Sequence, residues 1–147
     1  MRLKRQWFVP VAKKKVWDTL TYFNKIAQLA FLTDDFIASD KNIKQGTSFS
    51  ETHYFLGRRK YTGIFTKFKE PHAWELESYP KQGTGFPVYH KVLYFLTNFH
   101  HGTKVTCIID YETKWFLGKY IDYILLSLVY LFVLDIHRKM KQECMKK

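Results

Sequence analysis

The segment Tyr120–Gln142 (YIDYILLSLVYLFVLDIHRKMKQ) is the most apolar part of the chain, and it could be a membrane anchor or the core helix of a globular domain. Its uncharged run, Tyr123–Leu134, spans 12 residues between Asp122 and Asp135. A helix needs about 20 apolar residues to cross a bilayer, whereas a run of roughly 10–14 is typical of a buried helix. We therefore expect a long helix that packs against the rest of one domain.

One side of this helix is predicted to face the rest of the domain. At about 100° per residue, five apolar residues fall on that side. They are Ile121, Ile124, Leu125, Leu128 and Phe132. Asp135 falls on the same side and has two interpretations: a helix-end carboxylate that pairs with Lys139, or a polar group at the mouth of a cavity.

The opposite side of the helix carries His137 among its polar residues, but it is also rich in apolar ones, including Tyr123, Tyr130 and Val133. Such a side is too apolar for a free surface. We expect it to be covered by a second copy in a homodimer, by another partner or by an anionic membrane surface.

Composition indicates one folded domain that spans residues 1–147. Aromatic residues make up 18% of the chain, which is far above what disordered chains contain. The 24 Lys and Arg against 13 Asp and Glu give a net charge of +11, which favours anionic partners. These charges are scattered rather than gathered in one stripe, which argues against a nucleic-acid surface.

The two cysteines, Cys107 and Cys144, form neither a disulfide framework nor a zinc cluster, so a reducing, cytoplasmic location is expected. The N-terminus has no apolar stretch typical of a secretory signal. The neighbours His100 and His101 point apart, and no glycine-rich phosphate loop or metalloprotease motif occurs. We therefore predict no cofactor and no metal site.

Before the long helix, periodicity predicts one strand, two short helices and then several antiparallel strands. The strands are expected at Arg2–Val9, Thr47–Leu56, Lys60–Phe68, 73–79, Phe86–Phe99 and 103–115, and the helices at Ala12–Phe23 and 24–32. A long helix must bury its apolar side against a sheet, because domains are built from packed layers. The predicted fold class is therefore α+β, with a curved antiparallel sheet wrapped around the C-terminal helix and room between them.

Four segments, in this order and spacing, resemble the START-like superfamily, also described as Bet v 1-like or as polyketide cyclase/dehydrase and lipid transport proteins. They are VPVAKKKVWDTLTYFNKIAQL (9–29), KQGTSF (44–49), YTGIFTKFKEPHAWEL (61–76) and HHGTKVTCIIDYE (100–112). The resemblance implies a helix-grip fold with an apolar cavity between the sheet and the C-terminal helix. It carries no catalytic signature, so it assigns no catalytic residue.

A cavity of this kind would be lined by the inner face of the sheet and by the helix. From the sheet we expect Trp74, Leu76, His90, Tyr94 and Tyr111, and from the helix Leu128, Phe132 and Asp135. Mostly apolar walls with a few polar groups are typical of small-molecule sites, although ordinary core packing is the alternative at each position. Glu51, His53 and Tyr61 would join this set if their side chains face inward.

Three functions are compatible with these observations. The first is binding of a hydrophobic small molecule or lipid, with His90, Tyr94 or Tyr111 orienting its polar end. The second is an enzyme of the cyclase or dehydratase kind, which would need an acid and a base inside the cavity, such as His90 with Tyr94 or Asp135. The third is a basic interaction module for RNA or a protein partner.

Overall fold

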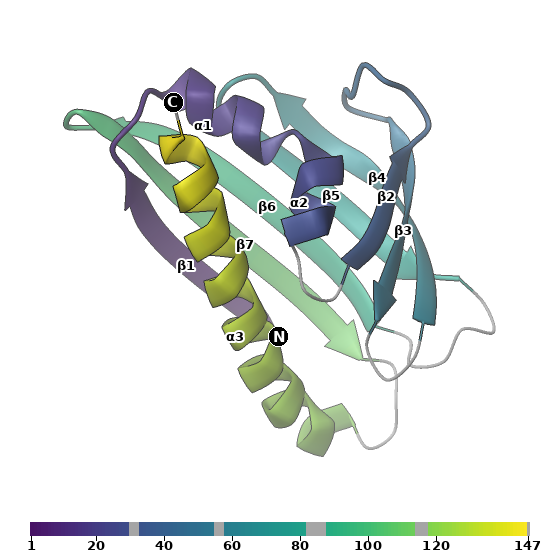
Figure 1. The fold of residues 1–147 in the computed structure, drawn as a ribbon. Helices are drawn as coiled ribbons and strands as arrows, with labels where there is room; N and C mark the ends of the chain where they lie inside the picture. The colour runs from purple at the N-terminus through teal and green to yellow at the C-terminus, as the bar shows by residue number, and fades with distance from the viewer. Residues whose placement is uncertain (30–32, 55–57, 82–87, 114–117, 147) are drawn as a thin grey trace.

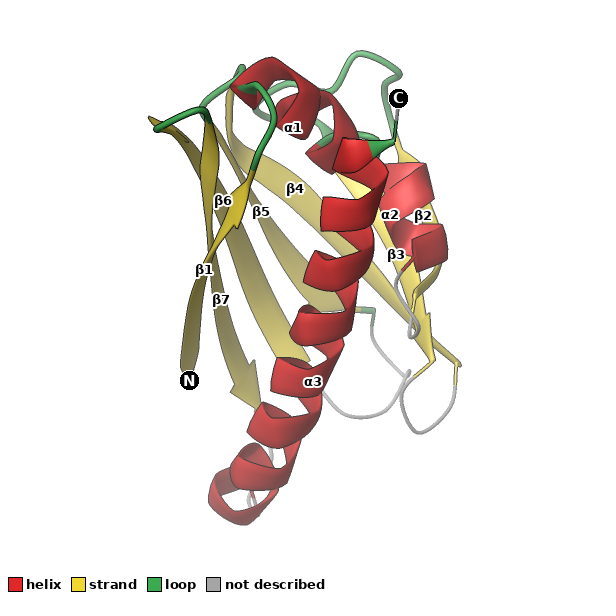
Figure 2. Cartoon of the chain, turned by 60° about the vertical axis from the view of Figure 1, so that its left-hand side comes forward, coloured by secondary structure: helices red, strands yellow, loops and turns green. Residues whose placement is uncertain are grey.

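The computed structural model describes residues 1–29, 33–54, 58–81, 88–113 and 118–146. Within these residues the chain forms seven strands and three helices. In chain order they are β1 (Arg2–Val9), α1 (Lys13–Leu20), α2 (Phe23–Leu29), β2 (Thr33–Ala38), β3 (Ser48–Tyr54), β4 (Arg58–Lys69), β5 (Ala73–Pro80), β6 (Val88–Phe99), β7 (Gly102–Thr113) and α3 (Gly118–Met145). The predicted α+β helix-grip class is confirmed: a curved antiparallel sheet lies behind the long α3, and α1 and α2 follow the first strand (Figure 1 and Figure 2).

The sheet has the strand order β1-β7-β6-β5-β4-β3-β2, and each pair of neighbours is antiparallel. The first strand therefore pairs with the last, from Arg2 opposite Asp110 to Val9 opposite Thr103. β2 was not predicted from the sequence; its TDDFIA segment has two aspartates and lies at the other edge of the sheet. Edge strands can carry charges in this way, because one side of the strand has no neighbour.

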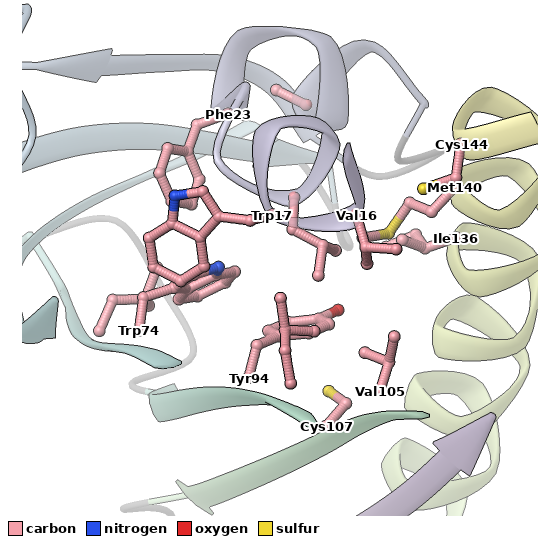
Figure 3. Packing of buried hydrophobic residues seen from close by; sticks show 14 of the residues in the cluster. Val16, Trp17, Phe23, Trp74, Tyr94, Val105, Cys107, Ile136, Met140 and Cys144 are labelled. Atoms are coloured by element: carbon pink, nitrogen blue, oxygen red, sulfur yellow. The ribbon is translucent and has the colours of Figure 1, made fainter. Parts of the chain in front are cut away.

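An aromatic core fills the concave side of the sheet under α1 and α2. Val16, Trp17 and Leu20 of α1 are buried against it, and Trp17 packs edge-on against Phe68. Phe23 at the start of α2 contacts three further rings, those of Phe36, Phe65 and Trp74. Figure 3 shows Trp17, Phe23, Trp74 and Tyr94 meeting above the sheet, with Ile136, Met140 and Cys144 closing the cluster from α3.

The face of α3 that packs against the domain differs from the predicted one. Among the α3 side chains that the structure describes, the buried ones are those of Val133, Ile136, His137, Met140 and Cys144. Ile124 and Leu128, which were expected to face the sheet, are 65% and 43% exposed and lie on the opposite side of the helix. The prediction was wrong because the first half of α3 is apolar all round, so helical periodicity alone does not select a face.

The last turns of α3 are fixed by contacts with the two short helices. Lys25 of α2 lies 2.5 Å from the carboxylate of Glu143. The ammonium of Lys15 in α1 donates to the main-chain carbonyl of Lys146 at 2.7 Å. These contacts anchor the C-terminal half of α3, whereas the exposed apolar residues Ile124, Leu128 and Leu131 lie in its first half.

Of the three residues predicted to form a homodimer contact, Tyr130 is exposed and Val133 is 3% exposed. Val133 therefore packs inside the domain and does not form a surface contact. The side chain of Tyr123 lies outside the described residues. Among the helices that the structure describes, none is long and apolar enough to cross a membrane.

Candidate functional site

A polar cluster interrupts the apolar inner face of the sheet. It consists of Glu51 and His53 on β3, Tyr61 on β4, Ser78 on β5 and His90 on β6. Alternate residues of a strand point to the same face, so Glu51 and His53 share the face of Phe49, which belongs to the apolar core. The cluster is thus a continuation of the core along the strands.

Strand register explains how side chains from four strands meet. Phe49, Gly63, Ser78, His90 and Tyr111 lie side by side across β3 to β7. The Gly63 position between Phe49 and Ser78 has no side chain, so groups on β3 can reach across β4. Glu51, two residues beyond Phe49, accepts a hydrogen bond of 2.6 Å at its Oε1 atom from the hydroxyl of Ser78.

The two histidines approach the same carboxylate from different strands. His90 Nε2 lies 3.1 Å from Glu51 Oε1, and His53 Nε2 lies 3.3 Å from Oε2. On its far side, the His53 ring places Nδ1 3.2 Å from the hydroxyl of Thr33 on β2. The ring of Tyr61 lies edge-on to both imidazoles, with centroids 5.1 and 5.5 Å away.

Glu51 remains ionised although it is 7% exposed. Burial raises the pKa of its carboxyl, but the contacts with His53 and His90 together outweigh burial, so the pKa lies below its ordinary value. Burial also raises the pKa of the Tyr61 hydroxyl. The cluster therefore holds a desolvated anion whose neighbours are two imidazoles and a hydroxyl.

A second polar group lies between the sheet and α3. The Tyr94 hydroxyl is 3.3 Å from His137 Nε2, and the His137 ring stacks on Trp7 of β1 with centroids 3.7 Å apart. Burial, together with the positive charge of Arg5, lowers the pKa of His137 to about 3. Burial raises the pKa of Tyr94 well above its ordinary value. His137 is therefore a neutral imidazole. It was predicted to lie on the outer side of the helix, but it is buried against the sheet.

Four buried nitrogen atoms in these groups have no hydrogen-bond partner within the part of the chain that the structure describes. They are Arg5 Nη1, His53 Nε2, Trp74 Nε1 and His137 Nδ1. For His53 Nε2, the 3.3 Å approach to Glu51 is close enough for an ion pair, but its direction does not make a hydrogen bond. Buried polar groups without partners are rare in folded proteins, so each of these nitrogens marks a place where a bound molecule or ion could supply the missing partner.

A groove opens to solvent between β1 and the first half of α3. Its volume is about 600 Å³, and its walls are Arg2, Leu3, Lys4, Ser127, Tyr130 and Leu131. The Arg5 guanidinium lies 5.7 Å from the centre of the Tyr130 ring, next to this groove. The structure thus leaves an open space beside α3 where Arg5 is one of the nearby charges.

The structure brings together part of the predicted site. Trp74, Leu76, Tyr94 and Tyr111 are buried on the inner face, and Trp74 stacks on Tyr94 with centroids 4.6 Å apart. His90 joins the polar cluster and lies beside Glu51, rather than beside Tyr94 or Asp135.

The three helix residues of the predicted site are placed differently. Leu128 is exposed on the outer side of α3, and the side chain of Phe132 lies outside the described residues. Asp135 forms ion pairs with Lys139 at 2.6 Å and Arg138 at 3.0 Å, which lower the pKa of its carboxyl. The pairing with Lys139 confirms the first of the two interpretations of Asp135.

Sequence reasoning left Arg5, Trp7 and His137 out of the site. The alternation of β1 could have indicated Arg5 and Trp7. Both lie, with Leu3 and Val9, on the less exposed side of that strand. A charged residue within such a series marks a side chain that must reach either a partner or solvent.

None of the known protein-family models matches the chain, and no curated protein matches it in sequence. Solved structures do match its fold. The protein TTHA0849 from Thermus thermophilus is 9% identical with a TM-score of 0.79, over 99% of this chain and 97% of that one. The ZhuI aromatase/cyclase from Streptomyces sp. R1128 is 10% identical with a TM-score of 0.79, over 98% and 93%.

A third similar structure, Ara h 8.0201, is 14% identical with a TM-score of 0.66, over 95% of this chain and 97% of that one. At these identities the similarity concerns the fold. It confirms the helix-grip fold that the resemblance of the four sequence segments implied.

Proposed function

We propose, from the premise that this chain has the START-like helix-grip fold, that it binds a hydrophobic small molecule or lipid between the sheet and α3. The proposed ligand has an oxygen-bearing polar end. Trp74, Leu76, Tyr94 and Tyr111 supply apolar and aromatic surface on the sheet. Apolar burial contributes roughly 25 cal/mol per Å², so a molecule of modest size can bind with useful affinity through these contacts.

The observation that carries this proposal is the pair of buried donors at Arg5 Nη1 and Trp74 Nε1. Both groups can only donate hydrogen bonds, and no described residue accepts from either nitrogen. A buried donor without a partner costs about 1–3 kcal/mol, which an oxygen of the ligand would recover. Arg5 also carries a charge, so an anionic oxygen such as a carboxylate fits best.

Two dyes that share a ring system and differ in one anionic group test this proposal. 8-Anilinonaphthalene-1-sulfonate carries the anion, and N-phenyl-1-naphthylamine is its neutral counterpart. We expect both to bind the wild-type protein with enhanced fluorescence. The Arg5→Met variant should bind the anionic dye roughly 10-fold more weakly, because a hydrogen bond to a charged group contributes about 1.5–3 kcal/mol. It should bind the neutral dye as the wild type does.

The matched control is Arg138→Met, which removes an exposed arginine on α3 that pairs with Asp135. It should leave both affinities unchanged. Native mass spectrometry of freshly purified protein provides an independent measurement, because a retained ligand adds a discrete mass. Absence of any copurified molecule, together with failure of both dyes to bind, would count decisively against this function.

An enzyme of the cyclase or dehydratase kind is the second candidate, and one observation favours it. Glu51 lies within 3.3 Å of two imidazoles on the inner face, so ionisable groups are within reach of each other. This is the arrangement that general acid–base catalysis needs, although the expected pairs of His90 with Tyr94 or Asp135 are not formed. The similarity in fold to an aromatase/cyclase agrees with this candidate.

Proton abstraction next to a carbonyl is the first step of cyclisation by aldol chemistry, and it can be measured directly. We would follow exchange of the C-2 protons of an aryl β-diketone into D₂O by NMR. The wild-type protein should accelerate exchange, and Glu51→Gln should reduce the acceleration by about 100-fold, the lower bound for a positioned base. Equal rates for the two proteins would exclude Glu51 as the base.

A further inference from the structure

We propose that Glu51, His53 and His90 form a binding site for one divalent transition metal ion of the zinc or ferrous iron class. Each of the three residues offers one ligand atom, and these atoms all lie within 4.8 Å of one another. Metal binding would be a property of the protein itself, and it does not rest on the proposed organic ligand.

The geometry of the three donors matches what a metal requires. Zinc lies about 2.0–2.2 Å from nitrogen and oxygen ligands, so its ligand atoms sit roughly 3–4 Å apart. The two histidine nitrogens lie 3.1 and 3.3 Å from the carboxylate oxygens. Because both Nε2 atoms lie this close to the same carboxylate, small movements would place one ion between all three groups.

His53 provides a separate indication. Its Nε2 atom is buried and has no hydrogen-bond partner in the described structure, in spite of its proximity to Glu51. The other ring nitrogen, Nδ1, lies 3.2 Å from the Thr33 hydroxyl. When Nδ1 carries the proton and donates it to Thr33, Nε2 presents its lone pair to the site, which is the usual state of a metal-binding imidazole.

Groups that surround the donors also resemble the outer shell of a metal site. The Ser78 hydroxyl donates to Glu51 Oε1 at 2.6 Å and so fixes the orientation of the carboxylate. Such outer hydrogen bonds hold metal ligands in position. A bound cation would balance the buried negative charge directly.

The donor types select the class of ion. Two imidazoles and one carboxylate suit zinc and ferrous iron, whereas calcium and magnesium prefer sites built from oxygen. Three protein ligands also leave coordination positions open. If the organic ligand of the proposed function binds beside the cluster, its oxygen could take one of these positions, and this last step alone rests on that proposal.

Titration of tag-free, chelator-treated protein with Zn²⁺ by calorimetry, and with Co²⁺ by visible absorption, tests the metal site. We expect one ion per chain. His53→Ala and His90→Ala each remove a direct metal ligand. Loss of an outer hydrogen-bond partner costs roughly 10- to 100-fold in metal affinity, and each of these two variants should lose more than that. Ser78→Ala removes such an outer partner and should weaken it by about 10-fold.

The matched control is the double variant His100→Ala and His101→Ala, which removes two exposed histidines of the turn between β6 and β7. It should bind as tightly as the wild type. Three outcomes would each overturn the assignment. The wild type binds neither ion, the His90→Ala variant keeps full metal affinity, or metal binding disappears in the double variant.

A measurement on the wild type alone decides the matter if the alanine variants do not fold. Two histidine ligands should give two exchangeable imidazole N–H signals, shifted by bound Co²⁺, in the proton NMR spectrum. One signal or none would contradict the site. Dye binding to the metal-free protein separates this question from the proposed function, because it needs no ion.

Discussion

The imidazole of His137 is held between the Trp7 ring and the Tyr94 hydroxyl, with the Arg5 charge nearby. Burial and that charge both disfavour protonation, which is why the pKa falls to about 3. The residue therefore contributes to stability only in its neutral form. In the unfolded chain, where these neighbours are absent, the imidazole takes up its proton near pH 6.5.

This difference predicts a loss of stability in mild acid. Between about pH 6.5 and pH 3 the unfolded chain binds a proton at His137 that the folded chain does not, so the free energy of unfolding falls as the pH is lowered. Within this window the loss should approach about 1.4 kcal/mol per pH unit. Urea unfolding of the wild type and of His137→Gln at pH 7 and pH 4.5 measures it.

The His137→Gln variant should lose less stability between the two pH values than the wild type. His101→Gln, at an exposed position of the β6–β7 turn, is the matched control and should follow the wild-type profile. Parallel profiles for the wild type and His137→Gln would show that His137 is not the group responsible.

At the scale of elements, β4 depends on a residue that usually weakens strands. A Cβ atom at Gly63 would lie 2.3 Å from the Glu77 carbonyl oxygen and 2.4 Å from Cζ of Phe49. The Phe49 ring extends over this position and stacks on Phe36, with centroids 4.8 Å apart. Gly63 is therefore needed for close packing between β3, β4 and β5.

Gly63→Ala should destabilise the protein by about 1–3 kcal/mol, the usual cost of overpacking, because the carbonyl belongs to a paired strand and cannot easily move. Urea unfolding checks this value. Ser50→Ala, at an exposed position of β3, should change the stability by less than about 0.5 kcal/mol. Unchanged stability of Gly63→Ala would mean that β5 and Phe49 can both move aside.

Apolar runs, turn residues and alternation together were sufficient to predict six of the seven strands, and the clearest alternation is that of Val105 and Cys107 in β7. The face of α3 could not be predicted in the same way. It is set by contacts with α1, α2 and β1, which lie more than 100 residues away in the sequence, and its first half is apolar on every side.

The polar cluster illustrates the same limit for the site. Glu51 and His90 come from strands that are not neighbours, and their approach depends on the register of β3, β4, β5 and β6 together. From the sequence, Glu51 and His53 were expected to join the predicted site of His90 only if their side chains face inward. Register is fixed by the packing of side chains across several strands, so it is not contained in any one segment.

For the whole molecule, the net charge of +11 and the exposed apolar residues of α3 act together. Ile124, Leu128 and Leu131 form an exposed stripe on the outer side of the helix. Basic proteins with exposed apolar side chains tend to adsorb to anionic membranes, where each nearby Lys or Arg contributes about 1 kcal/mol. Contact with such a membrane, or with a second copy of the chain, was predicted for the side of Tyr123, Tyr130 and Val133; we now expect it at the stripe of Ile124, Leu128 and Leu131.

The protein is expected to cosediment with vesicles that contain phosphatidylserine and not with vesicles of phosphatidylcholine alone. Because surface charges are screened within about 10 Å at 0.1 M salt, binding should weaken as the salt concentration rises. Leu128→Ser should weaken it further if the stripe enters the lipid. Equal binding to both kinds of vesicle would contradict a role for charge. Light scattering at the same protein concentrations tests whether the chain forms a dimer instead.

The pairing of β1 with β7 has a consequence for the order of folding. Arg2 meets Asp110 across a separation of 108 positions, so the first strand cannot find its partner until most of the chain has been synthesised. Closing so large a loop slows folding. Until β1 arrives, the edge of β7 would be open to pairing with other chains. We therefore expect the β4–β7 meander, whose strands pair with their neighbours in sequence, to form first and the two ends of the polypeptide to assemble on it later.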